Sequence, residues 1–274
     1  MSVPAFRIAA CSGGSRPHVA WRYGESMATL TGAGSASIEQ PDYWWYRARA
    51  DLLRTALERF VGDPKRVLDV GSADGPSVGW LRGQGTHVPL DIDPRGLASG
   101  GVCGSALALP FADGTFDLVA AFDVIEHCEP EADVLRELTR VLAPDGRLLL
   151  SVPAYEWAWT QFDDINGHHR RYTRRRAVRS VRAAGLTVDR ATYAFTSVFP
   201  IFAADRLRSR VREKLTRDVR AVPESDIMDL PTVSPMVERV LLGLSLLDRR
   251  LLRHADLPFG SSVLIAASKR DVGR

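Results

Sequence analysis

Cysteine is scarce in this chain, and so is lysine. Cys11, Cys103 and Cys128 are the only cysteines in 274 residues, and they form no Cys-x-x-Cys pair. We therefore expect reduced thiols, as in the cytoplasm, with neither a disulfide framework nor a zinc cluster. Three lysines accompany 33 arginines, which is a bias of composition that needs no partner to explain it. The charge-free stretch 191–204 contains a proline and is too short to span a bilayer.

Residues 66–75 combine an apolar strand with a glycine turn, in the order Arg-Val-Leu-Asp-Val-Gly-Ser-Ala-Asp-Gly. The run of apolar residues suits a strand buried on both faces. Gly71 and Gly75 let the backbone turn sharply and approach a ligand without a Cβ in the way. Asp91 closes the next predicted strand, where a carboxylate can accept hydrogen bonds from both hydroxyls of a ribose. This order predicts a nucleotide-cradling α/β sheet with an adenosine-type cofactor.

The turn departs from the dinucleotide pattern Gly-x-Gly-x-x-Gly because it carries two carboxylates, Asp69 and Asp74. Their charge would repel a pyrophosphate but would tolerate a cationic amino-acid group. The stretch resembles the first motif of class I S-adenosylmethionine-dependent methyltransferases, Asp/Glu-x-Gly-x-Gly-x-Gly, with Ala73 where the middle glycine is commoner. Residues 104–111, 116–127 and 141–152 resemble later strands of the same superfamily, in the same order.

This resemblance covers residues 41–194 and 258–269 and implies S-adenosylmethionine as the cofactor. The family usually has Asp where this chain has Ser105, which can accept a hydrogen bond from adenine but carries no charge. The residues that the resemblance assigns to the cofactor are Asp69, Gly71, Ser72, Ala73, Gly75, Asp91, Ile92, Ser105, Ala106, Leu107, Phe122 and Asp123.

Alternating strand and helix patterns predict an α/β fold with a Rossmann-like, doubly wound sheet. We expect strands near residues 66–70, 87–90, 101–104, 116–121, 147–152, 186–194 and 261–268, and the main helices near 41–60, 76–82, 130–141 and 173–184. By resemblance to the superfamily the sheet has seven strands, and its last strand is antiparallel. The predicted organisation is a flexible N-terminal extension at 1–40, a methyltransferase domain at 41–194 and 258–270, and a helical cap inserted at 195–257.

The cap region is apolar and strongly basic. Residues 168–220 carry a net charge of +11, so the rest of the chain carries −8. Leu207, Val211, Leu215 and Val219 form a narrow apolar stripe between arginines, and a broader apolar face lies within residues 236–252. The favoured interpretation is a helical hairpin packed on the sheet; the alternative is a basic segment, including Arg206, Arg208, Arg210 and Arg212, that docks on an anionic membrane surface. A small-molecule or lipid-linked sugar acceptor fits this charge better than nucleic acid, because no RNA-binding motif accompanies it.

Three histidines are candidates for the chemical step. His127 follows Glu126 at the end of the fourth strand region, where its imidazole could act as a base near pH 7. His168 and His169 lie in Gly-His-His-Arg-Arg-Tyr, after the aromatic run 153–159. This segment resembles a bacterial methyltransferase subgroup that also carries Trp-Trp-Tyr-x-Arg, for which this chain has Trp44-Trp-Tyr-Arg47. Each histidine could instead only order its loop, in the case of His168 and His169 against Asp163 or Asp164. We predict no metal site, since adjacent histidine side chains tend to diverge and no matching ligand set is evident.

The sequence thus predicts an S-adenosylmethionine-dependent methyltransferase, with O-methylation favoured. Two other functions stay open: a nicotinamide-dependent oxidoreductase, which the two carboxylates of the turn disfavour, and a non-catalytic module that binds an anionic partner.

Overall fold

A single mixed sheet forms the centre of the molecule. The computed structural model describes residues 9–11, 18–20, 40–72, 75–97, 100–216 and 232–270. Within them, nine strands pair in the order β1-β2-β5-β4-β3-β6-β7-β9-β8. The strands are β1 (Ala9–Cys11), β2 (His18–Ala20), β3 (Arg66–Val70), β4 (Thr86–Asp91), β5 (Val102–Cys103), β6 (Phe116–Phe122), β7 (Leu142–Pro153), β8 (Thr187–Ala194) and β9 (Ser262–Ser268).

Strands β3 to β9 form the predicted seven-stranded Rossmann-like sheet. β5, β4, β3, β6 and β7 are parallel neighbours, and β9 runs antiparallel between β7 and β8. The predicted strand positions agree closely with the observed ones, except that β7 begins at Leu142, earlier than the predicted residue 147. The register of β6 against β7 shifts between Phe116 and Leu118, so the early part of β7 joins the sheet through an irregularity that the apolar pattern does not indicate.

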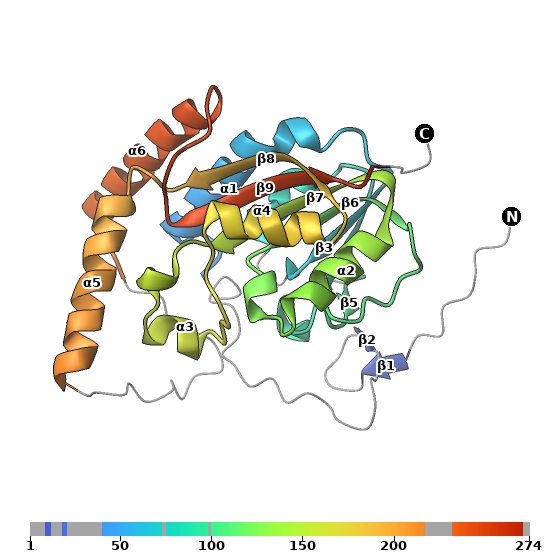
Figure 1. Ribbon diagram of the computed structural model, residues 1–274, viewed down its shortest axis with the longest axis horizontal. Coiled ribbons are helices and arrows are strands. Elements are labelled where there is room, and N and C mark those ends of the chain that lie inside the picture. The colour runs from blue at the N-terminus through green and yellow to red at the C-terminus, as the bar shows by residue number, and fades with distance from the viewer. Residues whose placement is uncertain are drawn as a thin grey trace, which may run out of the picture.

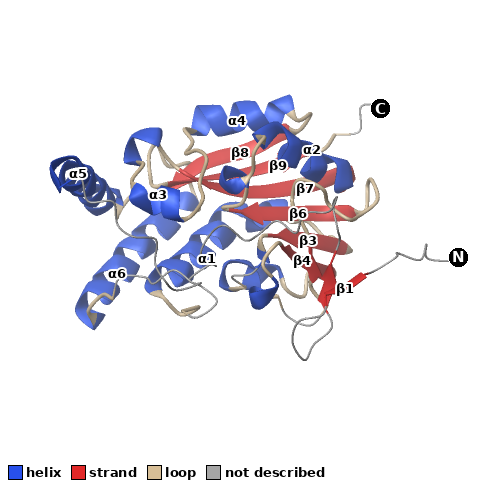
Figure 2. Cartoon of the chain, turned by 90° about the horizontal axis from the view of Figure 1, so that it is seen from below, coloured by secondary structure: helices blue, strands red, loops and turns tan. Residues whose placement is uncertain are grey.

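Helices cover both faces of the sheet. The helices are α1 (Trp44–Leu57), α2 (Glu131–Val141), α3 (Gln161–Ile165), α4 (Arg174–Ala183), α5 (Phe199–Thr216) and α6 (Pro235–Leu252). α2 and α4 lie on one face, and α1 lies on the other with α6 beside it (Figures 1 and 2). Thr173 caps α4 as predicted, because its side chain accepts a hydrogen bond from the backbone N–H of Arg176.

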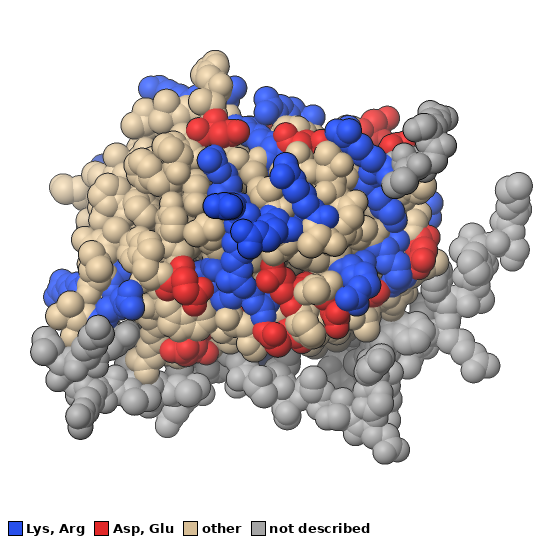
Figure 3. Space-filling view, viewed as in Figure 1, with Lys and Arg blue, Asp and Glu red and all other residues tan. Residues whose placement is uncertain are grey.

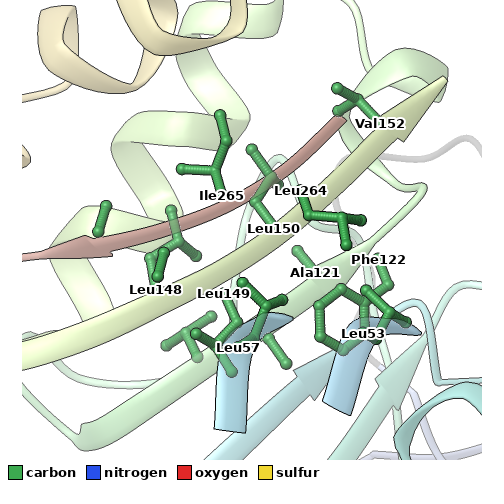
Figure 4. Packing of buried hydrophobic residues seen from close by; sticks show 14 of the residues in the cluster. Leu53, Leu57, Ala121, Phe122, Leu148, Leu149, Leu150, Val152, Leu264 and Ile265 are labelled. Carbon is green, nitrogen blue, oxygen red and sulfur yellow. The ribbon is translucent and has the colours of Figure 1, made fainter. Parts of the chain in front are cut away.

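The core lies between α1 and the central strands. Leu53 and Leu57 of α1 are fully buried against β6 and β7, including Leu149 (Figure 4). Burying one leucine side chain contributes about 1.5–3 kcal/mol, so this single row of contacts accounts for much of the attachment of α1. The helix therefore forms one layer of the domain and not a separate lid.

Two features differ from the predicted elements. The predicted helix at 76–82 is the 3₁₀ helix η4 (Pro76–Leu81), which follows a glycine with positive φ. Strands β1 and β2 lie within the segment predicted as a flexible extension, and β2 adds to the sheet by parallel pairing with β5. Such short strands carry too little periodicity to be recognised in a Gly- and Ser-rich sequence.

The inserted helices contact α1 and the loop after β7, not mainly the sheet. α6 packs on α1, and its buried side chains are Leu241, Ser245, Asp248 and Leu252. Most of the predicted apolar face of α6 is exposed, as are Leu207 and Val211 of α5. Val219 of the predicted stripe lies outside the described residues, and nothing is described of the Leu215 side chain.

Arg190 of β8 holds the inserted helices to the domain. Its guanidinium is nearly fully buried and donates hydrogen bonds to the carbonyl oxygens of Ala56, Leu252 and Ala255. These carbonyls lie at the carboxyl ends of α1 and α6, where a cation is favoured by the helix dipole. Asp256 completes the site through an ion pair of 2.7 Å with Arg190.

Candidate active site

The carboxyl ends of β5, β4, β3 and β6 lie side by side along one edge of the sheet. Open α/β sheets bind their ligands at such an edge, where the chain order reverses, and here the reversal lies between β3 and β6. The described residues that we predict to hold the cofactor all lie at, or just after, the end of one of these strands. The structure therefore brings together segments that are far apart in the sequence, from Asp69 to Asp123.

The turn after β3 has the backbone geometry that only glycine adopts easily. Gly71 has a φ of +73°, and its N–H donates to the carbonyl oxygen of Leu90 at 2.8 Å. A Cβ on Gly71 would lie 2.4 Å from Cγ2 of Val124, in the loop after β6. Ser72 is buried, and Gly75 also has a positive φ. Ala73 and Asp74, the other predicted members of this turn, lie outside the described residues.

Asp69 lies beneath the turn and is only 1% exposed. Its carboxylate Oδ2 is 3.6 Å from Nε2 of His87. Burial lowers the pKa of His87, and the nearby Arg82 lowers it further, so this imidazole is mainly neutral near pH 7. A buried carboxylate at this point makes the turn unfavourable for a pyrophosphate, as we expect from the sequence.

Asp91 and Asp93 have different partners at the end of β4. Oδ1 of Asp91 accepts a hydrogen bond from the backbone N–H of Asp93 at 2.8 Å, which fixes the carboxylate at the predicted ribose position. Asp93 instead forms an ion pair of 2.6 Å with Arg95 and caps η5 (Pro94–Gly96). Ile92 between them is 51% exposed, so its apolar side chain is available to pack on a ligand.

The segment after β5 begins with Ser105, whose hydroxyl oxygen accepts a hydrogen bond from the backbone N–H of Leu107 at 3.2 Å. The serine therefore stabilises its own turn, a role that the sequence comparison with the family's aspartate does not indicate. Ala106 and Leu107 follow in this turn, and Leu107 is partly exposed at 36%. The predicted adenine contact by Ser105 stays a prediction.

Asp123, after β6, is held by a residue that the sequence reasoning missed. Its φ is +56°, and its carboxylate forms an ion pair of 2.9 Å with Arg49 and accepts a hydrogen bond from Ser151. Arg49 is 4% exposed and also lies over the ring of Trp45. The available signal was its spacing, because Arg49 shares the buried face of α1 with Leu52 and Leu53. Phe122 is buried beside Trp80.

A second cluster lies at the short 3₁₀ helix η6 (Ile125–His127). Glu126 is fully buried, and burial together with the charge of Asp123 raises its pKa well above the usual range. Within the part of the chain that the structure describes, neither of its carboxylate oxygens has a hydrogen-bond partner. A buried carboxyl without a hydrogen-bond partner is costly, which sets Glu126 apart from an ordinary exposed carboxylate at the start of a helix.

Two of the three candidate histidines meet beside Glu126. The rings of His127 and His168 are 4.6 Å apart between centroids, in an edge-to-face arrangement. Partial desolvation by the surrounding loops and the neighbouring His168 lower the pKa of His127, whose side chain still reaches solvent. Nδ1 of His168 is 2.8 Å from Oδ1 of the buried Asp163, which confirms the predicted loop-ordering contact. His169 diverges and lies 4.0 Å from Glu129.

The Gly-His-His-Arg-Arg-Tyr segment joins two loops. Arg170 donates hydrogen bonds to the carbonyl oxygens of Ile125 and Cys128 and pairs with Glu129. Arg171 pairs with Asp163 at 2.7 Å and donates to the carbonyl oxygen of Ala154. Both arginines are nearly buried. The segment therefore fixes the loop after β6 against the loop after β7.

An aromatic loop follows β7. Tyr155 stacks on Trp157 and Tyr193, and burial raises the pKa of the Tyr155 hydroxyl to about 12, so it stays protonated at neutral pH. The helix α5 covers this loop: Arg206 donates to the hydroxyl of Thr160, and Arg210 donates to the carbonyl oxygen of Trp157. Trp157 is 38% exposed. The loop thus presents stacked rings next to the histidine cluster.

Comparison with known proteins indicates the kind of domain to which this edge belongs. Residues 68–150 match the family model described as a methyltransferase domain. This part of the chain is a methyltransferase domain. The match includes the turn after β3 and the loop after β6, which meet at this edge of the sheet.

The relatives cover only parts of the chain. The biotin biosynthesis bifunctional protein BioHC of Cellvibrio japonicus is 32% identical over 45% of this chain and 28% of its own length. The demethylmenaquinone methyltransferase of Beutenbergia cavernae is 32% identical over 47% of this chain and 54% of its own length. The chain thus spans about half or less of these curated relatives.

Among solved structures, a chain of the complex that contains the Haloferax volcanii Trm112 methyltransferase activator is similar in fold. It has a TM-score of 0.54 and 19% identity, and the match covers 87% of this chain and 94% of that one. At this level of identity the similarity establishes the shared fold alone.

Proposed function

We propose that this chain transfers a methyl group from S-adenosylmethionine to an oxygen of a small or lipid-linked acceptor. The observation that carries the proposal is the edge formed by β5, β4, β3 and β6: a glycine turn follows β3, the buried Asp91 ends β4, and the loop after β6 carries His127, which meets His168. When bound, the cofactor supplies an electrophilic methyl group on a sulfonium. Several relatives are named demethylmenaquinone methyltransferases, but the chain covers too little of them to carry over their acceptor.

The described residues suit this cofactor by their chemistry. Asp91 is positioned by the Asp93 N–H and can accept ribose hydroxyls. The carboxylates of Asp69 and Asp123 favour the cationic methionine portion over a pyrophosphate. Phe122 and Asp123 lie at the end of β6, on the side of the edge that is nearest the histidines.

The histidines belong to the acceptor side of this proposal. Methyl transfer to a hydroxyl needs an aligned oxygen and a place for the proton that the oxygen loses. The lowered pKa of His127 keeps its ring neutral at pH 7, so that it can accept a hydrogen bond or a proton. His168 and His169 complete the predicted set, with the ring of His168 next to that of His127.

Calorimetry with S-adenosylmethionine, S-adenosylhomocysteine and NAD tests the assignment. We expect both sulfur compounds to bind and NAD not to bind, and Asp91→Ala to weaken S-adenosylhomocysteine by roughly 1 to 3 kcal/mol. Replacing His127, His168 or His169 by Ala should change cofactor affinity by less than about threefold, or roughly 0.6 kcal/mol, while at least one loses turnover. Binding of NAD without S-adenosylmethionine would overturn the proposal in favour of an oxidoreductase.

We also propose that α5 and α6 place the enzyme on an anionic membrane surface without crossing it. Among the described residues, no helix combines the length and the apolar character that crossing a bilayer requires. The exposed apolar side chains of this end are Ile201, Leu207, Val211, Met236, Val237, Val240, Leu246, Leu247 and Leu251. Figure 3 shows a broad area without charged side chains over this end and a gathering of basic side chains over α4.

The structure narrows the set of arginines that can face a membrane. Arg206 and Arg210 turn toward the aromatic loop, whereas Arg208 and Arg212 are exposed beside Leu207 and Val211. On α4, which is not one of the inserted helices, Arg174, Arg175, Arg179 and Arg182 line a shallow pocket of about 390 Å³. Each cationic side chain near an anionic surface contributes about 1 kcal/mol.

Sedimentation with anionic liposomes tests this contact. Replacing Arg208 and Arg212 by Gln should weaken association by about 2 kcal/mol, or roughly 30-fold, at low salt. Gln at Arg175 and Arg179 removes the same charge elsewhere and serves as the matched control. A wild-type protein that stays in the supernatant at low salt would make the exposed helices a structural cap only.

A further inference from the structure

Three ligand-type side chains converge beside the cofactor edge. One ligand atom each from Glu126, His127 and His168 lies within 4.8 Å of the other two. The side chains of His168 and its sequence neighbour His169 diverge, as we expect for adjacent residues, so these two histidines do not share a ligand. The partner of His168 is instead His127, which lies in a different loop, much earlier in the chain.

Glu126 supplies an independent observation that points to a ligand. Its side chain is 0% exposed, and in the described residues neither carboxylate oxygen has a hydrogen-bond partner. Buried carboxylates in proteins are paired, hydrogen-bonded or bound to a metal. Arg49 and Arg171 lie near enough to act on the charge of Glu126, but they form their ion pairs with Asp123 and Asp163.

Both histidines are held in the way that metal ligands usually are. Nδ1 of His168 is fixed by the buried Asp163, which leaves Nε2 to face the cluster. The ring of His127 lies near the backbone of Asn166. A carboxylate or carbonyl behind each ligating histidine fixes its tautomer and orientation.

We propose that Glu126, His127 and His168 bind a divalent transition-metal ion such as Zn²⁺ or Mn²⁺. Two imidazoles and one carboxylate suit such ions, and three protein ligands leave a coordination position open. Metal–ligand bonds of about 2.1 Å place neighbouring ligand atoms about 3.4 Å apart, so the ion would draw these side chains together by about 1 Å. His127 is exposed, and it provides the open side of the site.

The ion would serve the acceptor and not the cofactor. The site lies in η6, shortly after Asp123, so a bound acceptor oxygen would be next to the cofactor edge. A hydroxyl held by the ion would lose its proton to solvent at a lower pH than a free hydroxyl would. Its oxygen would then bond to the methyl carbon as the bond between that carbon and the sulfonium sulfur breaks, and S-adenosylhomocysteine would leave. This role rests on the proposed methyl transfer, but metal binding itself does not.

Metal content and calorimetry on the full chain test the site. After chelation and dialysis, Zn²⁺, Mn²⁺ and Co²⁺ are titrated separately into wild-type protein and into Glu126→Gln, His127→Ala and His168→Ala. We expect one ion per chain in the wild type and at least tenfold weaker binding in each variant. His169→Ala is the matched control, because its side chain is next in sequence but points away, and its binding should equal that of the wild type.

Two further measurements keep the outcomes distinct. Bound Co²⁺ should give visible d–d absorption that changes in His127→Ala, the variant whose exposed side chain is least able to disturb folding. Binding by the wild type well below one ion per chain, or unchanged binding in all three variants, would overturn the metal site. S-adenosylhomocysteine affinity of the wild type is measured in parallel. Metal binding without S-adenosylhomocysteine binding would refute the proposed function. S-adenosylhomocysteine binding without metal binding would refute only the metal site.

Discussion

Replacing Gly71 by Ala should destabilise the fold at the point where the cofactor turn meets the loop after β6. An Ala in the left-handed region at φ +73° costs roughly 1–2 kcal/mol. Its Cβ would lie 2.4 Å from Cγ2 of Val124, and such overpacking costs about 1–3 kcal/mol more. The expected total is about 2–5 kcal/mol of lost unfolding free energy.

Gly83 provides a control with the same backbone strain and no clash. Its φ is +88°, and a Cβ there would have nothing within 4 Å among the described atoms. Gly83→Ala should therefore lower the unfolding free energy by only about 1–2 kcal/mol. Replacing Gly by Ala also reduces the conformational entropy of the unfolded chain, but this effect is the same in both variants. Urea denaturation followed by circular dichroism measures the difference at constant m-value.

A double variant separates the clash from the strain. Val124→Ala removes Cγ2, so it should recover about 1–3 kcal/mol in the Gly71→Ala background beyond its own effect in the wild type. Equal stabilities of the Gly71 and Gly83 variants, or no recovery on removing the Val124 methyl groups, would refute the close approach of these two loops.

Three further predictions address the cofactor edge and the scaffold. Ser105→Asp should tighten S-adenosylhomocysteine binding several-fold in calorimetry. The new carboxylate can still accept the hydrogen bond from the Leu107 N–H, and it adds a negative charge toward the adenine amino group. Weaker binding would contradict our placement of this turn. Arg190→Ala should lower the unfolding free energy by about 3 kcal/mol, since it leaves buried helix-end carbonyls unpaired, whereas Ala at the exposed Arg179 should change it by less than about 0.5 kcal/mol. Arg140 holds the pKa of Glu137 below its ordinary value of 4.5, so the stability from this pair is present above pH 4.5 and is lost as the pH falls through the lowered pKa. In acid unfolding curves, Glu137→Gln should therefore flatten the decrease of the unfolding free energy with falling pH. An unchanged curve would exclude this pair as the source of that decrease.

The sheet could be predicted from the sequence because each central strand is a mainly apolar run between turn residues. Val67 to Val70 and Phe116 to Phe122 are examples, and both are buried almost throughout. The early start of β7 could not be predicted, because Pro144, Asp145 and Gly146 interrupt its apolar pattern and the pairing depends on a shifted register with β6. Local composition predicts a turn at these residues, and only the neighbouring strand decides otherwise.

The candidate site also has some features that the sequence predicts and others that it does not. The positions of Gly71 and Asp91 follow from a local motif, since the turn and the strand end lie close in sequence. The ion pair of Arg49 with Asp123 and the approach of His127 to His168 each join segments that are distant in the sequence. No spacing rule connects such pairs, because their distance depends on how α1 and the loop after β7 pack on the sheet.

The burial of Arg190 bears on how this protein can be dissected. The predicted insertion at 195–257 looks removable as a unit, because the sheet closes on either side of it. Yet its last helix supplies carbonyl oxygens to a guanidinium inside the methyltransferase domain, and Asp256 supplies the counter-charge. In a truncated chain without these residues, the buried guanidinium of Arg190 would keep only one of these hydrogen-bond acceptors, the carbonyl oxygen of Ala56. We therefore expect a minimal domain made by that deletion to be insoluble, and a shortened version to need either residues 252–256 or a neutral residue at position 190.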